Sequence, residues 1–228
     1  MLTGIIGAMV VETDAIKGML TDKTVENFGG IEFVRGRLGK SDVVVATCGI
    51  GKVFAAICAQ TMILKYAPDR IINTGVAGSL SESVGLLDIA ISTSVVQHDM
   101  DTSPLGDPVG LISGINVVYL PASESLISEV RSAAERVGIR TSIGVIASGD
   151  QFIADGVKKN YIRDTFSAIA CEMEGAAIGQ VCYANRVDFV VIRAISDNAD
   201  DEAGALDYPT LCKKAAEQSQ KLLMAMNG

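Results

Sequence analysis

The chain has 228 residues, of which 49% are hydrophobic and 20% are charged, and its formal net charge is −8 at neutral pH. This length can bury a substantial core, whereas the acidic balance argues against nucleic acid or an anionic membrane as a partner. The five cysteines have no C-x-x-C spacing and His98 is the only histidine, so we expect reduced thiols, a cytoplasmic location, and neither a metal site nor a Ser-His-Asp triad.

The N-terminal residues 4–8 form a short apolar run that predicts a buried first strand. No basic segment precedes this run and the sequence turns acidic at Glu12, which is typical of a first strand and not of a signal peptide. The apolar runs of the chain are far shorter than the roughly 20 residues that a membrane-spanning helix needs. We therefore expect no membrane partner.

Strand and helix patterns alternate along the rest of the chain. We expect helices at about 12–20, 53–66, 123–137, 155–165, 175–184 and 208–226. We expect strands at 31–38, 43–46, 70–75, 88–96, 142–147, 168–171 and from 189 onward. No linker or repeat interrupts this order, which predicts a single α/β domain over residues 1–228 with a mixed, largely parallel central sheet flanked by helices.

The segment 189–201 begins as a β-branched apolar run and ends in a cluster of acids that includes Asp197, Asp200 and Asp201. Open α/β sheets place their chemistry at the carboxyl ends of strands, and Asp197 lies at such an end. Apolar surroundings can raise the pKa of a carboxyl group enough for it to act as an acid near neutral pH. The alternative is that Asp197 only caps the turn that follows.

Two further acids, Glu12 and Glu174, follow apolar strands at the start of predicted helices. Taken singly, each can be explained by a favourable helix-dipole interaction of about 0.3–1 kcal/mol. Three strand-end acids in one sheet would converge on one crevice, however, and unequal paired carboxylates are suited to cleaving a glycosidic bond. The sequence thus favours a site built from Glu12, Glu174 and Asp197.

Glycine-rich turns are expected after three strands, at Gly4–Gly7, Gly49–Lys52 and Gly75–Gly78. None matches G-x-G-x-x-G, and the Gly51-Lys52 pair lacks the first glycine and the Ser/Thr of a Walker A loop. We therefore expect no dinucleotide site and no NTPase. Turns of this kind do let a small polar ligand approach the backbone closely.

Six motifs, at nearly constant spacing from the first strand to the last helix, carry a close resemblance to a known family. They are Gly4-Ile5-Ile6-Gly7-Ala8-Met9 with Glu12, Gly49-Ile50-Gly51-Lys52-Val53, Asn73-Thr74-Gly75-Val76-Ala77-Gly78, Ser148-Gly149-Asp150-Gln151-Phe152-Ile153, Glu172-Met173-Glu174 and Arg193-Ala194-Ile195-Ser196-Asp197. On these motifs the chain resembles the 5′-methylthioadenosine/S-adenosylhomocysteine nucleosidases. The resemblance implies a nucleoside phosphorylase-like fold, a homodimer, no cofactor, and hydrolysis of the bond between adenine and a 5′-substituted ribose.

The resemblance also implies a role for each matched residue. Asp197 would protonate adenine N7 with Ser196 orienting it, Glu12 would act as general base on water, and Glu174 would hold the ribose hydroxyls. The implied substrate-binding residues are Met9, Ile50, Gly78, Phe152, Ile153, Met173, Ser196 and Arg193, with Phe152 stacking on the base, the Ile153 backbone reading its edge and Met173 packing on the sugar.

Three departures from the family pattern concern the 5′ end of the substrate. Val76 stands where many relatives have Ser, and Leu105 stands where relatives often have a Phe that completes the partner subunit's pocket. The stretch 97–104 is more similar to members that also accept 6-amino-6-deoxyfutalosine. Leu105 lies in the irregular segment 99–114, a length of loop that is usually functional or at an interface.

Two other functions remain open on the sequence. A phosphorylase would need cationic groups around a phosphate dianion, but the Gly75–Leu80 segment has no arginine, Glu12 would repel phosphate, and Arg193 is the one arginine in the matched motifs. A module that only binds nucleosides would not need all three acids. The sequence therefore favours a hydrolase that acts on a small-molecule nucleoside.

Overall fold

A computed structural model describes residues 1–199 and 208–227; Asp200 and Asp201 of the acidic cluster lie outside the described residues. Its strands are β1 (Leu2–Gly7), β2 (Thr21–Phe28), β3 (Ile31–Leu38), β4 (Ser41–Thr47), β5 (Arg70–Ser79), β6 (Ile89–Gln97), β7 (Leu120–Pro121), β8 (Thr141–Ser148), β9 (Ala168–Glu172) and β10 (Asp188–Asp197). Its helices are α1 (Val10–Met19), α2 (Lys52–Tyr66), η1 (Ser103–Leu105), α3 (Glu124–Arg136), α4 (Gly156–Phe166), α5 (Gly175–Asn185) and α6 (Tyr208–Asn227). The order of elements agrees with the expected α/β alternation.

The sheet is mixed, as expected, and part of it closes on itself. Parallel pairing joins β4, β1, β5 and β10 in sequence across its middle. The strands β5, β10, β6, β8 and β9 then pair in a ring, because β10 bonds to both β5 and β6 while β9 returns to β5. The outer strands β3 and β2 extend the sheet by antiparallel pairing. The sequence did not predict this closure.

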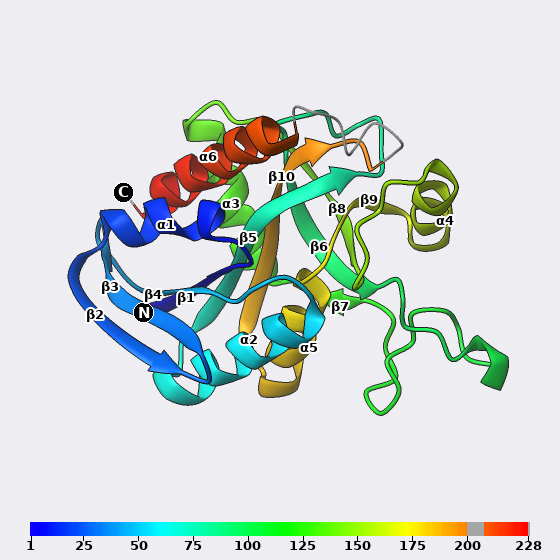
Figure 1. Cartoon of the computed structure of the whole chain (residues 1–228), viewed down its shortest axis with the longest axis horizontal. Coiled ribbons are helices and arrows are strands. Elements are labelled where there is room, and N and C mark those ends of the chain that lie inside the picture. Colours follow the sequence, from blue (N-terminus) through cyan, green and yellow to red (C-terminus); the bar gives the residue numbers. More distant parts are fainter. Residues whose placement is uncertain (200–207, 228) are drawn as a thin grey trace.

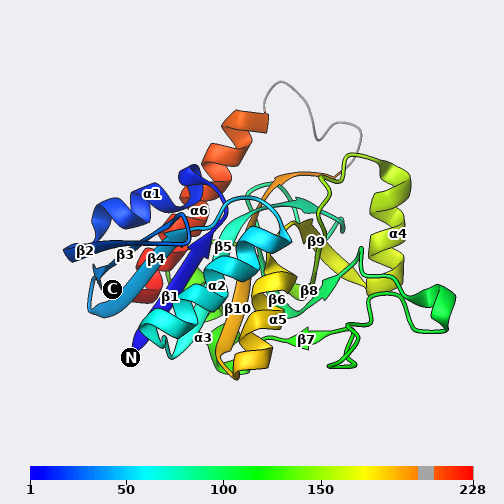
Figure 2. The ribbon, with the colours of Figure 1, turned by 60° about the horizontal axis from the view of Figure 1, so that its bottom comes forward.

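Helices cover both faces of the sheet (Figures 1 and 2). Helices α1, α3 and α6 pack together on one face, and α2 and α5 pack together on the other. The buried apolar side chains of the strands fill the space between these layers, and the five cysteines are all buried. Among the described residues, no helix is both long and apolar enough to cross a membrane.

Strand β5 differs from the prediction of a strand that ends in a glycine turn at Gly75. It runs on to Ser79, and neither Gly75 nor Gly78 has a positive φ angle. A Cβ atom at Gly75 would lie 2.6 Å from Glu12 Oε1, and one at Gly78 would lie 2.8 Å from Asp197 Oδ1. A Cβ atom at Gly75 would also collide with Arg193 Nη1, so these glycines allow charged side chains to approach a strand closely.

The segment between β6 and β7 is irregular as expected, apart from the short helix η1. It projects from the body of the molecule, beyond α5 and α4 (Figures 1 and 2). At its tip, the side chain of Leu105 is 84% exposed.

Candidate active site

A cavity of about 110 Å³ opens where β1, β5, β9 and β10 end. Its lining residues come from these strand ends and from two loops, the one between β4 and α2 and the one that follows β8. They are Ala8, Met9, Glu12, Ile50, Val76, Ala77, Gly78, Gln151, Phe152, Ile153, Cys171, Glu172, Met173, Glu174, Ser196 and Asp197. The three strand-end acids therefore do meet in one cavity.

Glu12 is held by backbone N–H groups on both of its carboxylate oxygens. Oε2 accepts hydrogen bonds from Ala8 N at 2.7 Å and Met9 N at 2.9 Å, and Oε1 accepts one from Val76 N at 3.0 Å. Burial raises the pKa of the Glu12 carboxyl above its ordinary value, while the nearby Arg193 charge and these three N–H groups act in the opposite direction. Glu12 is thus a fixed carboxylate whose affinity for a proton is increased.

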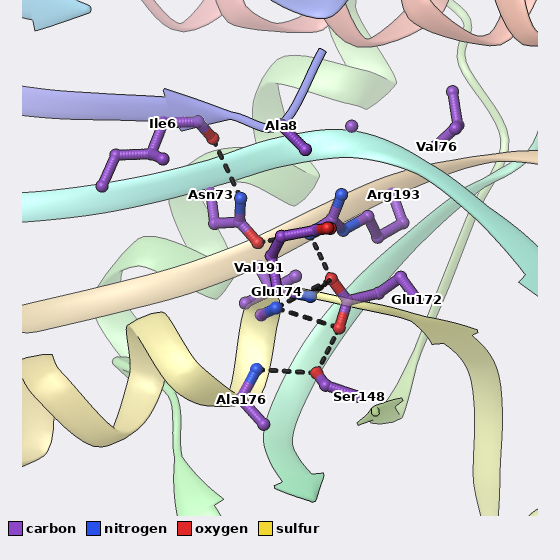
Figure 3. A network of polar contacts seen from close by, with 12 residues as sticks. Ile6, Ala8, Asn73, Val76, Ser148, Glu172, Glu174, Ala176, Val191 and Arg193 are labelled. Carbon is purple, nitrogen blue, oxygen red and sulfur yellow. Dashed lines mark hydrogen bonds and ion pairs between the residues drawn. The ribbon is translucent and has the colours of Figure 1, made fainter. Parts of the chain in front are cut away.

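Arg193 is fully buried outside the cavity lining and links Glu172 of β9 with Glu174, the N-cap residue of α5 (Figure 3). Its Nη2 donates to Glu172 Oε2 in a very short ion pair, to Asn73 Oδ1 at 2.5 Å and to Glu174 Oε2 at 3.5 Å. A buried ion pair is favourable only when its geometry is good and further hydrogen bonds satisfy its polar atoms. Nη2 is satisfied in this way, whereas Arg193 Nε has no hydrogen-bond partner among the described residues. Asn73 Nδ2 in turn donates to the Ile6 carbonyl at 2.9 Å, which links Arg193 to β1.

Glu172 and Glu174 have different surroundings although one residue separates them. Glu172 accepts hydrogen bonds from Ser148 Oγ and from the backbone N–H groups of Glu174 and Gly175, in addition to its ion pair with Arg193. Glu174 Oε1 accepts one hydrogen bond, from Gly51 N at 2.9 Å. Burial raises the pKa of Glu174 to about 7, against the lowering effect of Arg193, so Glu174 exchanges a proton near neutral pH.

Asp197 lines the cavity at the last residue of β10. Its Oδ2 accepts a hydrogen bond from Ser196 Oγ at 2.8 Å, and its Oδ1 accepts one from Ala199 N at 2.8 Å. The register of β10 against β5 shifts here, since Ile195 pairs with Ala77 whereas Asp197 pairs with Gly78. The bulge leaves Ser196 as the extra residue, and bulges of this kind redirect side chains next to active sites.

The outer part of the cavity is apolar and more open. The side chains of Ile50 and Phe152 are each 54% exposed, while Ile153 beside them is buried. Met9 and Met173 complete this wall. A flat ring and flexible thioethers at the entrance suit a planar, partly apolar ligand.

Comparison with known proteins places the chain in a family. Residues 3–226 match the family model described as the phosphorylase superfamily. The chain belongs to this superfamily. A 5′-methylthioadenosine/S-adenosylhomocysteine nucleosidase of Shewanella putrefaciens is 39% identical over 227 residues, which are 99% of this chain and 98% of that protein. This similarity makes the chain a member of the nucleosidase family within the superfamily, and hence an enzyme.

Solved structures of the nucleosidase family have the same fold. A Neisseria meningitidis 5′-methylthioadenosine/S-adenosylhomocysteine nucleosidase in complex with methylthio-immucillin-A is 33% identical, with a TM-score of 0.94 over 99% of this chain and 97% of that one. A futalosine hydrolase of Helicobacter pylori is 35% identical, with a TM-score of 0.93 over 99% of this chain and 96% of that one. Together they confirm the nucleoside phosphorylase-like fold expected from the motifs.

Within this nucleosidase fold, the cavity is lined by all of the sequence-predicted site residues except Arg193. The resemblance predicts Arg193 among the substrate-binding residues, whereas the structure has it outside the lining, in ion pairs with Glu172 and Glu174. Sequence reasoning assigned no role to Glu172, Asn73 or Ser148, which complete that buried network. The spacing Glu172-Met173-Glu174 was the available signal, because alternate residues at a strand end share a side.

Proposed function

We propose that the chain hydrolyses the N-glycosidic bond of 5′-methylthioadenosine, S-adenosylhomocysteine and related 5′-substituted adenosines, releasing adenine. The observation that carries the proposal is the convergence of Glu12, Glu174 and Asp197 on one apolar-walled cavity. Two carboxylic groups with different surroundings can supply the acid and the base that glycoside hydrolysis needs. The names of the relatives support the choice of substrate.

In the proposed mechanism, Asp197 donates a proton to adenine N7. Adenine anion is a poor leaving group, so protonation lets the base depart neutral while the ribose passes through an oxocarbenium-like state. The Ser196 hydroxyl fixes one carboxylate oxygen of Asp197 and the Ala199 N–H fixes the other. A positioned general acid contributes about 10²–10⁴-fold to the rate.

Glu12 acts as general base on the attacking water. The raised pKa of its buried carboxyl makes it a better proton acceptor than an exposed glutamate, and its three backbone hydrogen bonds keep it in place. Val76 stands where many relatives have Ser, and its backbone N–H donates to Glu12. Glu12 is therefore held at residue 76 by the backbone and needs no hydroxyl there.

Glu174 holds the ribose hydroxyls, and the wall residues hold the two ends of the nucleoside. Met173 packs on the sugar, Phe152 stacks on the base, and the Ile153 backbone reads the edge of the base. Met9, Ile50 and Gly78 complete the pocket, to which all of these residues belong. Arg193 acts indirectly in this scheme by fixing Glu174.

The lining of the cavity supports hydrolysis over phosphorolysis. A phosphate dianion is bound by arginine, lysine or clustered backbone donors, and the described lining contains neither lysine nor arginine. The N–H groups of Ala8, Met9 and Val76 already bond to Glu12, whose own charge repels an anion. Water is the nucleophile that fits.

A second substrate, 6-amino-6-deoxyfutalosine, is favoured by a separate observation. The futalosine hydrolase of Helicobacter pylori covers 99% of this chain at 35% identity. The stretch 97–104 is also more similar to family members that accept this nucleoside. We infer that the pocket accepts a larger 5′-substituent on the same adenine end.

We also propose that the chain is a cytoplasmic homodimer. Val53, Phe54 and Ile57 on α2 are exposed beside the hollow between α2 and α5, and an exposed apolar face of this kind is suited to a second copy. The segment that carries Leu105 would reach the partner's pocket. Sedimentation at micromolar concentration tests this, and a monomer with full activity would contradict it.

The experiment that tests the reaction is product analysis with 5′-methylthioadenosine, in phosphate-free buffer and again with added phosphate. We expect free adenine and methylthioribose in equal amounts at the same rate in both buffers. Cleavage only with phosphate would make the chain a phosphorylase. Absence of adenine in both buffers, with each of the named nucleosides, would leave a binding module.

A further inference from the structure

Three loops beside the cavity are joined by a closed ring of hydrogen bonds that the mechanism above does not use. Lys52 Nζ donates to Asp99 Oδ1 at 2.6 Å, Asp150 N donates to Asp99 Oδ2 at 2.9 Å, and Lys52 N donates to Asp150 Oδ1 at 2.7 Å. We call these three residues the Lys52–Asp99–Asp150 ring. Lys52 is the first residue of α2 and follows the loop after β4, whereas Asp99 and Asp150 lie in the loops that follow β6 and β8.

The ring replaces a cap that helix α2 lacks. Its N-cap residue is Gly51, at φ 100°, so no side chain caps the helix, and its first turn contains no acidic residue. Asp150 supplies the missing acceptor and negative charge from another loop. A carboxylate at this end of a helix is favourable because of the exposed N–H groups and the helix dipole.

The approach of Asp150 to α2 depends on two glycines. A Cβ atom at Gly51 would lie 3.0 Å from Asp150 Oδ1, and one at Gly149 would collide with the imidazole ring of His98. The loops therefore approach each other closely at these two glycines, while Lys52, Gln97 and Asp150 also line the hollow between α2 and α5. Lys52 Nζ also donates to Gln97 Oε1 at 3.1 Å, and Gln97 donates to Gln180 Oε1 on α5 at 2.6 Å, which anchors the ring to a helix.

Two of the joined loops carry the open wall of the cavity. The loop of Lys52 presents Ile50 to the cavity and its Gly51 N–H to Glu174, while the loop of Asp150 presents Phe152 and Ile153. The Lys52 and Asp99 side chains are 19% and 20% exposed, so solvent screens their ion pair only in part. Hydrogen bonding to Lys52 and to Asp150 N lowers the pKa of Asp99, against the effect of burial, so the carboxylate remains charged near neutral pH.

We propose that Asp99 is a positioning residue that, through the Lys52–Asp99–Asp150 ring, holds the two loops in the arrangement that binds the nucleoside. The proposal rests on the proposed function, since it assigns the loops to substrate binding. Asp99 touches neither Glu12 nor Asp197 in the described contacts, so it acts on binding and leaves the proton transfers unchanged. Its carboxylate is needed because both oxygens accept, one from an ammonium and the other from a backbone N–H.

The test is a double-mutant cycle with Asp99→Ala, Lys52→Met and the double variant. We expect each single variant to raise KM about fivefold with kcat within about twofold, and the double variant to raise KM by about the same factor, because both changes break one ring. Glu32→Ala is the matched control, because it also removes the acid of an ion pair, that between Glu32 of β3 and Lys17 of α1. It should leave KM unchanged. Unchanged KM in Asp99→Ala, or a double variant with multiplied effects, would overturn the proposal.

Hydrogen exchange of the ligand-free protein separates this proposal from the proposed reaction. We expect faster exchange at 49–53 and 149–153 in Asp99→Ala than in the wild type, and no change in Glu32→Ala. If the wild type were inactive but Asp99→Ala still exchanged faster at these two segments, the proposed reaction would be contradicted and the role of the ring would stand. An active wild type whose loops exchange equally in both forms would contradict the ring alone.

Discussion

At the floor of the cavity each carboxylate is fixed by at least one hydrogen bond, whereas at the entrance Ile50 and Phe152 leave about half of their side-chain surface exposed. The floor is built from strand ends and the entrance from loops. Fixed donors and acceptors need no rearrangement when charge develops during a reaction. An open apolar wall, in contrast, gains its stabilisation only when a ligand or another chain covers it. We therefore expect changes at the floor to alter kcat and changes at the entrance to alter KM.

The largest effect is expected for Asp197→Asn at the floor. Asparagine keeps the shape of the side chain and can still accept from Ala199 N–H, but its amide is not acidic enough to transfer a proton to adenine. We expect kcat to fall by about 10³-fold or more, while the affinity for substrate changes only a few-fold. Steady-state adenine release and calorimetric binding of 5′-methylthioadenosine check this; equal losses in both would contradict the role of Asp197 as the acid.

A smaller effect is expected for Phe152→Ala at the entrance. Stacking of a base on an aromatic ring contributes about 1–3 kcal/mol, so we expect KM to rise about tenfold with little change in kcat. Tyr161→Ala is a matched control, because Tyr161 is an exposed aromatic residue of α4 outside the cavity. If kcat fell as much as kcat/KM in Phe152→Ala, floor and entrance would not act separately.

A third effect is measured in stability and not in turnover, and it concerns Glu174→Gln. The pKa of Glu174 is about 7 in the folded chain and near 4.3 in an unfolded chain. Between these values the unfolded chain loses the proton first, so ionisation favours unfolding and the contribution of Glu174 to stability falls as pH rises. Glutamine cannot ionise. We therefore expect the stability of Glu174→Gln relative to wild type to increase by about 1 kcal/mol or more between pH 5 and pH 8.

Urea unfolding of both proteins across this pH range measures that difference. Contributions from titrating groups that do not interact with Glu174, such as the buried His98, cancel when the two proteins are compared at each pH. Glu32→Gln on the exposed surface is the control and should keep a constant difference from wild type. A flat difference for Glu174→Gln as well would mean that the proton of Glu174 is lost at the same pH in the folded and unfolded chains.

Sequence predicts the floor better than the entrance for a physical reason. A continuous apolar run in the sequence predicts a buried strand. The position of an acid that follows such a run, such as Glu12 or Asp197, can therefore be predicted from the local pattern. The same pattern wrongly predicted that β5 ends in a turn at Gly75. A glycine near a strand end is typical either of a turn or of a place where another side chain approaches the backbone closely. Only the packing of Glu12 against β5 separates these readings.

The contacts that order the entrance leave almost no local signal. Lys52 and Asp99 are 47 residues apart in the sequence, and Lys52 and Asp150 are 98 residues apart. Each of these side chains, read alone, is an ordinary surface charge. The closure of the sheet through β10 and β9 brings their loops together, and pairing between strands distant in sequence is not encoded in any one of them. The buried role of Arg193 was missed for the same reason.

Ser196 is an extra residue in β10, so the side of the sheet to which Asp197 points depends on the number of residues before it in the strand. Along an unbroken strand, successive side chains point to opposite faces, and β10 departs from that alternation against β5 only at its last step. A chain that lacked Ser196 would keep the aspartate and still turn it to the other side of the sheet. Loss or gain of a single codon at this point would therefore remove the acid from the cavity as completely as replacing it, whereas the long segment ahead of β7 can change in length without moving Asp197.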